Sequence, residues 1–176
     1  LGKTIKDRGF DVVMLEKLKV FERKPQESSA QDYLSWLGVA WEKDAEETLQ
    51  VLERRRPDWL VVDHYAVDAK WERLMAPAVG RTMVIDDLAN REHLCDLLLD
   101  QNLGRLESDY DALVPECCTR LIGPKYALLR PDFARLRRRS LARRKNPELK
   151  RILISMGGVD FDNTTGQVLA ALAESG

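Results

Sequence analysis

Four short apolar runs restrict the fold of this chain more than any other feature, because they have the length of buried strands rather than of helices. They lie at residues 59–62, 82–85, 97–99 and 119–122. Segments with helical periodicity, at 41–56 and 69–79, lie on either side of the first run. Strands that alternate with helical segments are typical of a parallel sheet with helices on both faces. The sequence therefore predicts an α/β domain.

The segments outside this core predict smaller elements and the beginning of a second domain. They comprise a helix over 1–8 capped by Gly9, a strand over 11–15, a loop over 16–30, a short helix over 31–37, a basic helix over 131–144, a linker over 145–148, a strand over 152–154 and a helix over 164–173. Because the pattern begins and ends partway through a domain, we expect a piece of a longer protein. The predicted domains are residues 1–130, a connection over 131–149 and a second domain that starts over 150–176.

The composition favours a globular protein in a reducing compartment. Hydrophobic residues make up 44% and charged residues 32%, with a net charge of −1. This balance gives no overall attraction to nucleic acid or to an anionic membrane, and we interpret the basic helix at 131–144 as a solvated face. No apolar run has the length of a membrane span. The three cysteines, Cys95, Cys117 and Cys118, lack CxxC spacing, so we expect reduced thiols in a cytoplasmic and monomeric protein.

A pair of glycines in the last part of the sequence predicts a phosphate-binding loop. An apolar run at 152–154 precedes the pair, and a helical segment that begins at Thr164 follows it. Glycines let backbone amides approach a ligand closely, and the start of a helix adds positive potential. The motif is neither GxGxxG nor GxxxxGK[ST], and an ordinary strand–helix turn is the alternative. The candidate ligand residues of this segment are Ser155, Gly157, Gly158, Asp160 and Asn163.

Polar side chains follow three of the predicted strands, at the point where each strand ends. They are Asp63, His64, Tyr65, Asp68, Trp71 and Glu72 after the first strand, Asp86, Asp87, Asn90, Arg91 and His93 after the second, and Asp100, Gln101 and Asn102 after the third. Because ligands of open parallel sheets bind beyond the carboxyl ends of the strands, we expect these clusters to converge on one crevice. A sugar with several hydrogen-bonding groups would suit such a crevice.

Each of these polar residues also has a structural interpretation. Asp63 would cap the next turn, and Tyr65 would simply pack its ring. The Asp86–Asp87 dipeptide would provide a cap and a partner for Arg91, while His93 would be a hydrogen-bonded, partly buried histidine. The same dipeptide and His93 offer metal ligands, but their spacing fits no standard pair such as HExxH. We therefore expect neither a metal nor another cofactor.

Four longer strings carry a resemblance to a known family. They are VVDHYAVDAKWE at 61–72, VIDDLANREHLCDLLLDQN at 84–102, LIGPKYALLRPDF at 121–133 and ILISMGGVDFDNTTGQVLAAL at 152–172. In content and order they resemble the PseG family, the UDP-2,4-diacetamido-2,4,6-trideoxy-β-L-altropyranose hydrolases of pseudaminic acid biosynthesis. The resemblance implies a GT-B-like fold, with a Rossmann-type parallel sheet domain followed here by the start of a second Rossmann-type domain.

The resemblance also implies a reaction and a set of site residues. Water would replace UDP at the anomeric carbon with inversion and without a metal. The family's proposed catalytic histidine lies in a loop of the form GxGHxxR that this sequence does not contain, and neither His64 nor His93 matches it. We therefore expect this chain alone to be inactive. The implied catalytic residue is Tyr65, and the implied substrate-binding residues are Asp63, Asp87, Asn90, Arg91, Gln101, Asn102, Arg130, Ser155, Gly157, Gly158, Asp160 and Asn163.

Two other functions remain compatible with the sequence. A GT-B glycosyltransferase would share the fold and the diphosphate loop but would move the sugar to an acceptor other than water. A non-catalytic module that binds a nucleotide sugar would need the same pocket and no catalytic base. Release of UDP that depends on an acceptor would distinguish the glycosyltransferase from the hydrolase.

Overall fold

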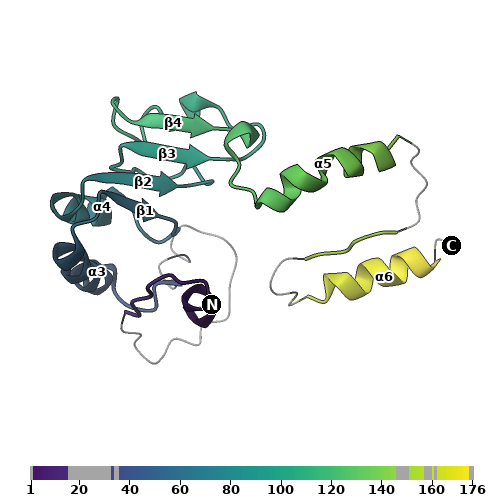
Figure 1. Cartoon of the computed structure of the whole chain (residues 1–176), viewed down its shortest axis with the longest axis horizontal. Helices are drawn as coiled ribbons and strands as arrows, with labels where there is room; N and C mark the ends of the chain where they lie inside the picture. Colours follow the sequence, from purple (N-terminus) through teal and green to yellow (C-terminus); the bar gives the residue numbers. More distant parts are fainter. Residues whose placement is uncertain are drawn as a thin grey trace. The chain divides into compact units, whose positions relative to one another are not determined.

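The computed structural model describes residues 2–15, 33, 36–145, 151–156, 160 and 162–174. The chain divides into two compact units, Leu1–Leu128 and Leu129–Gly176. The first unit contains a parallel sheet, and the second contains helices α5 (Pro131–Arg143) and α6 (Thr164–Glu174) (Figure 1). No helix in these described ranges is long and apolar enough to cross a membrane.

The sheet of the first unit confirms the predicted α/β architecture. Its strands are β1 (Trp59–Val62), β2 (Arg81–Ile85), β3 (Leu97–Asp100) and β4 (Thr119–Ile122). They pair in the order β1-β2-β3-β4, and each neighbouring pair is parallel (Figure 1). Because all four strands run in the same direction, their carboxyl ends lie along one edge of the sheet.

Two helices pack against the sheet, α3 (Trp41–Arg55) and α4 (Ala69–Met75), and a 3-10 turn, η2 (Ala76–Ala78), extends the second. Helix α3 ends where Arg56 adopts a left-handed φ of 43°. The next residue is Pro57, which disfavours the right-handed helical conformation of the residue before it. Asp68 caps the start of helix α4, and its carboxylate accepts a hydrogen bond of 2.9 Å from the amide of Lys70.

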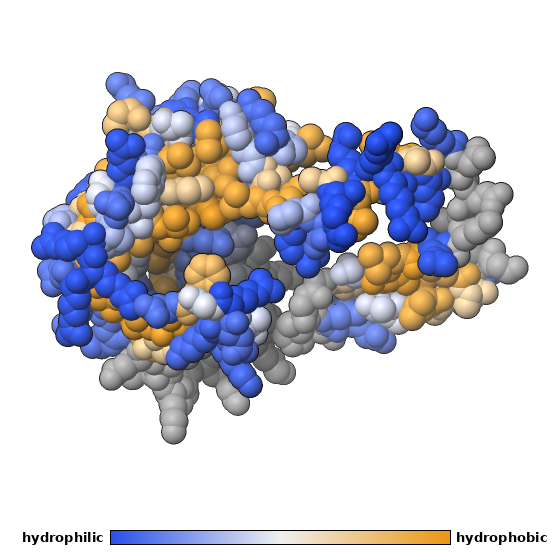
Figure 2. All heavy atoms as spheres, in the orientation of Figure 1, coloured by the Kyte–Doolittle hydropathy of each residue, from blue (hydrophilic) through white to orange (hydrophobic). Residues whose placement is uncertain are grey.

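The two faces of the sheet differ in how well they are covered. Val62, Val84 and Leu98 share one face and are buried in the same core as residues of α3 and α4. On the other face of β1, Trp59 and Val61 are 43% and 54% exposed. Hydrophobic side chains gather over the strands in this view (Figure 2). Within the described part of the chain, the prediction of helices on both faces therefore holds for one face of these strands.

Two of the smaller predicted strands are not formed. Residues 11–15 and 152–154 have no regular secondary structure. A strand is stable only when a neighbour pairs with its backbone, and the described residues supply no such neighbour to either segment. The predicted helix over 1–8 is α1 (Gly2–Lys6), and the predicted helix over 164–173 is α6. The predicted loop at 16–30 and most of the helix at 31–37 lie outside the described residues.

Gly9 caps α1 as the sequence predicts. It adopts a φ of 86°, a left-handed conformation that favours glycine. Its amide donates to the carbonyl of Lys6 at 2.9 Å, and the amide of Phe10 donates to the carbonyl of Ile5 at 3.4 Å. This pair of bonds is the Schellman motif that commonly ends a helix.

We expect Gly80→Ala to lower the free energy of unfolding by about 1–3 kcal/mol, because a side chain at this position overpacks the turn before β2. A Cβ atom at Gly80 would lie 2.6 Å from the carbonyl oxygen of Asp58. That oxygen cannot easily move, since it accepts the amide of Arg81 at 2.9 Å. Urea unfolding measures the change.

The matched control is Gly2→Ala, at the start of α1. The nearest atom to a Cβ there is the sulfur of Met14 at 3.5 Å, an ordinary contact. This change should leave stability the same or slightly higher, because alanine favours helices. Equal unfolding curves for the two variants would contradict the predicted clash.

Candidate functional site

The carboxyl ends of β1, β2 and β3 surround a pocket of ≈ 360 Å³ in the first unit. Its polar lining comes from all three strand ends and comprises Asp63, Tyr65, Asp86, Asp87, Gln101 and Asn102. The structure thus brings together five of the residues that we expected to contact a ligand, and adds Asp86. The strands place them there because parallel strands present their carboxyl ends at one edge.

Tyr65 and Asp87 form the central contact of the pocket. The hydroxyl of Tyr65 donates to Asp87 Oδ2 at 3.0 Å. The backbone carbonyl of Asp87 accepts two further bonds, from Asn102 Nδ2 at 3.2 Å and from Arg105 Nη2 at 2.8 Å. The other carboxyl oxygen, Asp87 Oδ1, is buried and has no hydrogen-bond partner among the described residues. Hydrogen bonds therefore hold both the carboxylate and the backbone carbonyl of Asp87, while Oδ1 accepts none among the described residues.

The hydroxyl of Tyr65 is a hydrogen-bond donor at neutral pH. Burial and the hydrogen bond to Asp87 raise the pKa of Tyr65 to about 12. A phenol with such a pKa keeps its proton under physiological conditions. Tyr65 can thus orient an oxygen atom or a carboxyl group, but it does not serve as a base.

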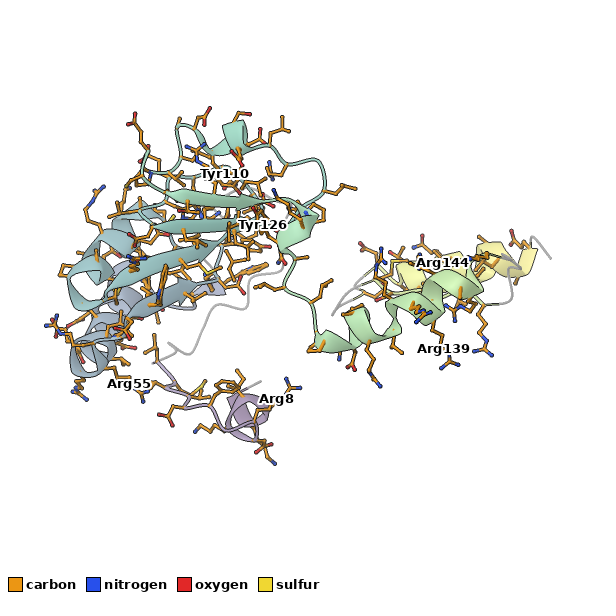
Figure 3. The ribbon with its side chains drawn as sticks, turned by 45° about the horizontal axis from the view of Figure 1, so that its top comes forward. Arg8, Arg55, Tyr110, Tyr126, Arg139 and Arg144 are labelled. Carbon is orange, nitrogen blue, oxygen red and sulfur yellow. The ribbon has the colours of Figure 1, made fainter. Side chains whose placement is uncertain are left out.

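A buried polar network lies directly below the pocket. Asp86 accepts hydrogen bonds from Arg91 Nη1 at 2.8 Å, from the Tyr110 hydroxyl at 2.9 Å and from the Ala89 amide at 2.9 Å. The hydroxyl of Tyr110, a fully buried residue labelled in Figure 3, also lies 2.9 Å from Asp100 Oδ2, so the two carboxylates share its single hydrogen. Burial opposes ionisation of Asp86, but nearby His93, these hydrogen bonds and the charge of Arg91 outweigh it. They hold the pKa of Asp86 well below its ordinary value.

His93 belongs to this network rather than to the pocket wall. Its Nδ1 lies 2.7 Å from Glu72 Oε1, and both side chains are fully buried. Glu72 Oε2 also accepts the amide of Leu94 at 2.5 Å. Burial lowers the pKa of His93, but Asp86 and Glu72 outweigh it, so that the pKa is raised overall. The structure therefore supports the interpretation of His93 as a hydrogen-bonded histidine, with a partner on α4, and buries it more fully than the partial burial that we expected.

The other expected residues of the first unit support the loops around the pocket. Arg91 donates through Nε to the carbonyl of Val67 at 2.9 Å, and so ties the loop after β2 to the loop after β1. Asn90 is exposed and accepts from Arg91 Nη1 at 3.3 Å. His64 Nδ1 accepts the amide of Ala66 at 3.1 Å. Gln101 Oε1 accepts the amide of Leu128 at 2.7 Å.

The expected residues of the second unit are only partly described. Gly157 and Gly158 lie outside the described residues. The carboxylate of Asp160 accepts the amides of Thr164 and Thr165 at 2.8 and 2.9 Å, and thereby caps α6. The remaining expected residues are Ser155, Asn163 with a left-handed φ of 50°, and Arg130, which precedes α5. Figure 3 labels Arg139 on α5 and Arg144 directly after it, in the basic segment interpreted as a solvated face. Contact of any of these residues with a ligand stays a prediction.

Several residues around the site were not predicted from the sequence. Arg105 and Tyr110 join the buried network, and two aromatic residues, Tyr33 and Trp36, contact the ring of Tyr65. The position of Tyr110 inside a polar loop is the one sequence signal that could have indicated a buried residue there.

Among the described residues, no group of three or more His, Cys, Asp or Glu side chains is placed to hold a metal ion.

Stability should fall as the pH rises through the raised pKa of His93. The ordinary value is 6.5, so the contribution of the charged imidazole is complete below about that pH and is lost above the folded-state pKa. The charged and titratable groups near it are Glu72, Asp86 and Arg91. Urea unfolding at several pH values between about 6 and about 9 should show this fall in the wild type and a flatter profile in His93→Gln.

The difference in stability between the wild type and His93→Gln separates the effect of His93 from that of the second histidine, His64. Burial lowers the pKa of His64, which acts in the opposite direction but is present in both proteins. A stability difference that is constant across the pH range would contradict the assignment of His93 as a charged partner of Glu72.

No protein-family model matches the chain. Over 130 residues, or 73% of its length, it is 30% identical to the UDP-2,4-diacetamido-2,4,6-trideoxy-beta-L-altropyranose hydrolase of Campylobacter jejuni, and the match covers 45% of that protein. Over 131 residues it is 26% identical to an uncharacterized protein of Methanocaldococcus jannaschii, of which the match covers 27%. The chain spans less than half the length of both curated relatives. It is a distant, partial relative of a UDP-sugar hydrolase, built on a Rossmann-like parallel α/β sheet.

Proposed function

We propose that the intact protein hydrolyses a UDP-activated 2,4-diacetamido-2,4,6-trideoxy sugar and releases UDP and the free sugar. The observation that carries the proposal is the pocket at the carboxyl ends of β1, β2 and β3, with the Tyr65–Asp87 contact at its centre. This pocket occurs in a chain that is 30% identical to a hydrolase of such a nucleotide sugar. Polar groups that converge on one concave site suit a ligand with several hydrogen-bonding groups.

The proposed architecture of the intact protein is GT-B-like. We propose a sugar pocket in the first unit and, separately, a diphosphate-binding segment in the second. Asp160 already accepts the first amides of α6, so those amides are not free for a phosphate. We therefore assign the diphosphate to the backbone around Gly157 and Gly158, with Ser155 beside them. Arg130, in the connection towards α5, adds positive charge, and the reaction needs no metal.

The proposed reaction is an inverting substitution by water. The water oxygen bonds to the anomeric carbon as the carbon–oxygen bond to the diphosphate breaks, and the water proton passes to a base. Tyr65 keeps its proton and positions the water or the departing oxygen. Neither histidine of this chain suits the base, because His64 Nδ1 holds the Ala66 amide and His93 is buried against Glu72. A diphosphate is a good leaving group, so the glycine loop mainly stabilises the charge that develops on it.

The test is UDP release from the synthetic UDP-diacetamido sugar by the intact protein, with the anomer of the product followed by NMR. We expect release without any acceptor and a product of inverted anomeric configuration. Gly157→Val should impair this turnover, because a side chain would displace the diphosphate from the backbone. Release that requires an acceptor would identify a glycosyltransferase, and binding without release would identify a nucleotide-sugar binding module.

A further inference from the structure

The ring of Tyr65 belongs to an aromatic cluster beside the pocket. Its centroid lies 5.0 Å from that of Tyr33 and 5.8 Å from that of Trp36. Tyr33 and Trp36 contact each other edge to face at 5.2 Å. Trp36 is nevertheless 62% exposed, so much of its indole surface is uncovered. Apolar surface of this kind next to a polar pocket marks a place where a ligand can bury apolar groups.

Asp87 supplies a second, independent sign of a ligand group in the same place. Its Oδ1 atom is removed from water and has no hydrogen-bond partner among the described residues. A buried acceptor without a partner is costly, and in binding sites such an atom commonly receives a donor from the ligand. The Tyr65 hydroxyl holds the other carboxyl oxygen, and Asn102 and Arg105 hold the backbone carbonyl of Asp87.

Tyr65 joins these two features, since its hydroxyl reaches Asp87 and its ring contacts the aromatic pair. A ligand that lies along Tyr65 would thus meet a hydrogen-bond acceptor at one end and apolar rings at the other. The pocket wall adds two apolar side chains, Ile85 and Leu128. The chemistry required of this ligand is an N–H or O–H donor close to methyl or other C–H groups.

Building on the proposed function, we infer that Asp87 together with Tyr33 and Trp36 forms a subsite that selects N-acetylated, deoxygenated sugars. Asp87 Oδ1 accepts the amide N–H of an acetamido group. The aromatic rings cover methyl groups and the C–H face of the sugar. A diacetamido trideoxy sugar offers two amide N–H groups and three methyl groups, whereas glucose offers none of either. These residues therefore determine specificity, while the reaction at the anomeric carbon takes place beside them.

The experiment measures binding of free sugars to the intact protein by saturation-transfer NMR and titration. The probes are the methyl glycoside of 2,4-diacetamido-2,4,6-trideoxy-L-altrose and, for comparison, methyl glucoside. The variants are Trp36→Ala and Asp87→Asn. The control is Trp59→Ala, which removes another exposed tryptophan at the amino end of β1, away from the pocket. Circular dichroism and thermal unfolding confirm that each variant is folded.

We expect saturation transfer to the acetyl methyl protons in the wild type and in Trp59→Ala. Trp36→Ala should raise the Kd of the diacetamido glycoside roughly tenfold, as expected for loss of an aromatic contact. Asp87→Asn should raise it by about tenfold to a hundredfold, as expected for loss of a hydrogen bond to a charged acceptor.

Two results would overturn the inference. One is a wild type that binds methyl glucoside as tightly as the diacetamido glycoside, or binds neither. The other is an unchanged Kd for the diacetamido glycoside in both folded variants, Trp36→Ala and Asp87→Asn. Failure of the proposed function is a separate result, because absence of UDP release leaves the sugar-binding measurements interpretable.

Discussion

Asp86→Ala is expected to lower the free energy of unfolding by about 3–5 kcal/mol, because it breaks a buried ion pair by removing one partner. The side chain of Asp86 is fully buried and accepts hydrogen bonds from Arg91 and Tyr110. Removing the carboxylate leaves the Arg91 charge and the Tyr110 hydroxyl without this acceptor in a site shielded from water. The measurement is urea unfolding at neutral pH.

A second variant and a control make this result specific. Asp86→Asn retains the shape and some hydrogen bonds but not the charge, so it should lose roughly half as much stability and can be studied if the alanine variant does not fold. The control is Asp11→Ala, whose carboxylate is 80% exposed and contacts Arg55 at 3.2 Å. Its effect should stay below about 1 kcal/mol. Equal losses for Asp86→Asn and Asp11→Ala would show that the network does not stabilise the fold.

The low pKa of Asp86 predicts that its contribution to stability depends on pH. Since its folded-state pKa lies below the ordinary value of 3.8, its contribution to stability is present above that value and is lost as the pH falls through the folded-state pKa. The stability difference between wild type and Asp86→Asn should therefore shrink at low pH. Unfolding followed at about pH 3 and about pH 7 tests this change.

Tyr65→Phe is expected to lower the kcat of UDP-sugar hydrolysis in the intact protein about a hundredfold, the order of effect typical of losing one hydrogen-bonding group positioned at the reacting centre. The phenylalanine ring still packs against Tyr33 and Trp36, so KM should change by less than about threefold. The hydroxyl bond to Asp87 at 3.0 Å is lost, and with it the group that we propose to orient the water or the departing oxygen. Steady-state kinetics of UDP release measure both constants.

The matched control for this prediction is Tyr126→Phe. Tyr126 lies in a 3-10 turn, η4 (Pro124–Tyr126), and does not line the pocket. Its kinetics should match those of the wild type. A Tyr65→Phe variant with unchanged kcat would leave Tyr65 with a packing role only.

The sequence predicted a feature correctly where that feature depends on residues close together in the chain. Strands β1 to β4 were predicted within about one residue, since short apolar runs between turn residues report burial directly. The strands at 11–15 and 152–154 were wrong for the opposite reason. Their composition suits a strand, but a strand forms only when another segment pairs with it. The alternation of residues along the chain carries no information about that partner.

The polar residues after the strands show the same limit at the site. The sequence indicated that they meet at one edge of the sheet, and five of the expected ligand contacts line the pocket there. It did not distinguish the roles of two adjacent aspartates. Asp86 is buried against Arg91 and Tyr110, whereas Asp87 holds Tyr65 and keeps one oxygen free. Neighbouring side chains after a strand point in different directions, and their partners come from other segments.

The sequence by itself determined the parallel α/β architecture of the first unit and the edge at which its polar residues gather, because both follow from the order of short apolar and polar segments. Only the tertiary structure decided which of those residues are buried supports and which face the pocket. His93 is a buried supporting residue because α4 places Glu72 within hydrogen-bond distance of its imidazole. Tyr65 faces the pocket because Asp87 holds its hydroxyl while Tyr33 and Trp36 hold its ring. These roles depend on contacts between segments that are distant in the sequence, and such contacts form only when the chain folds.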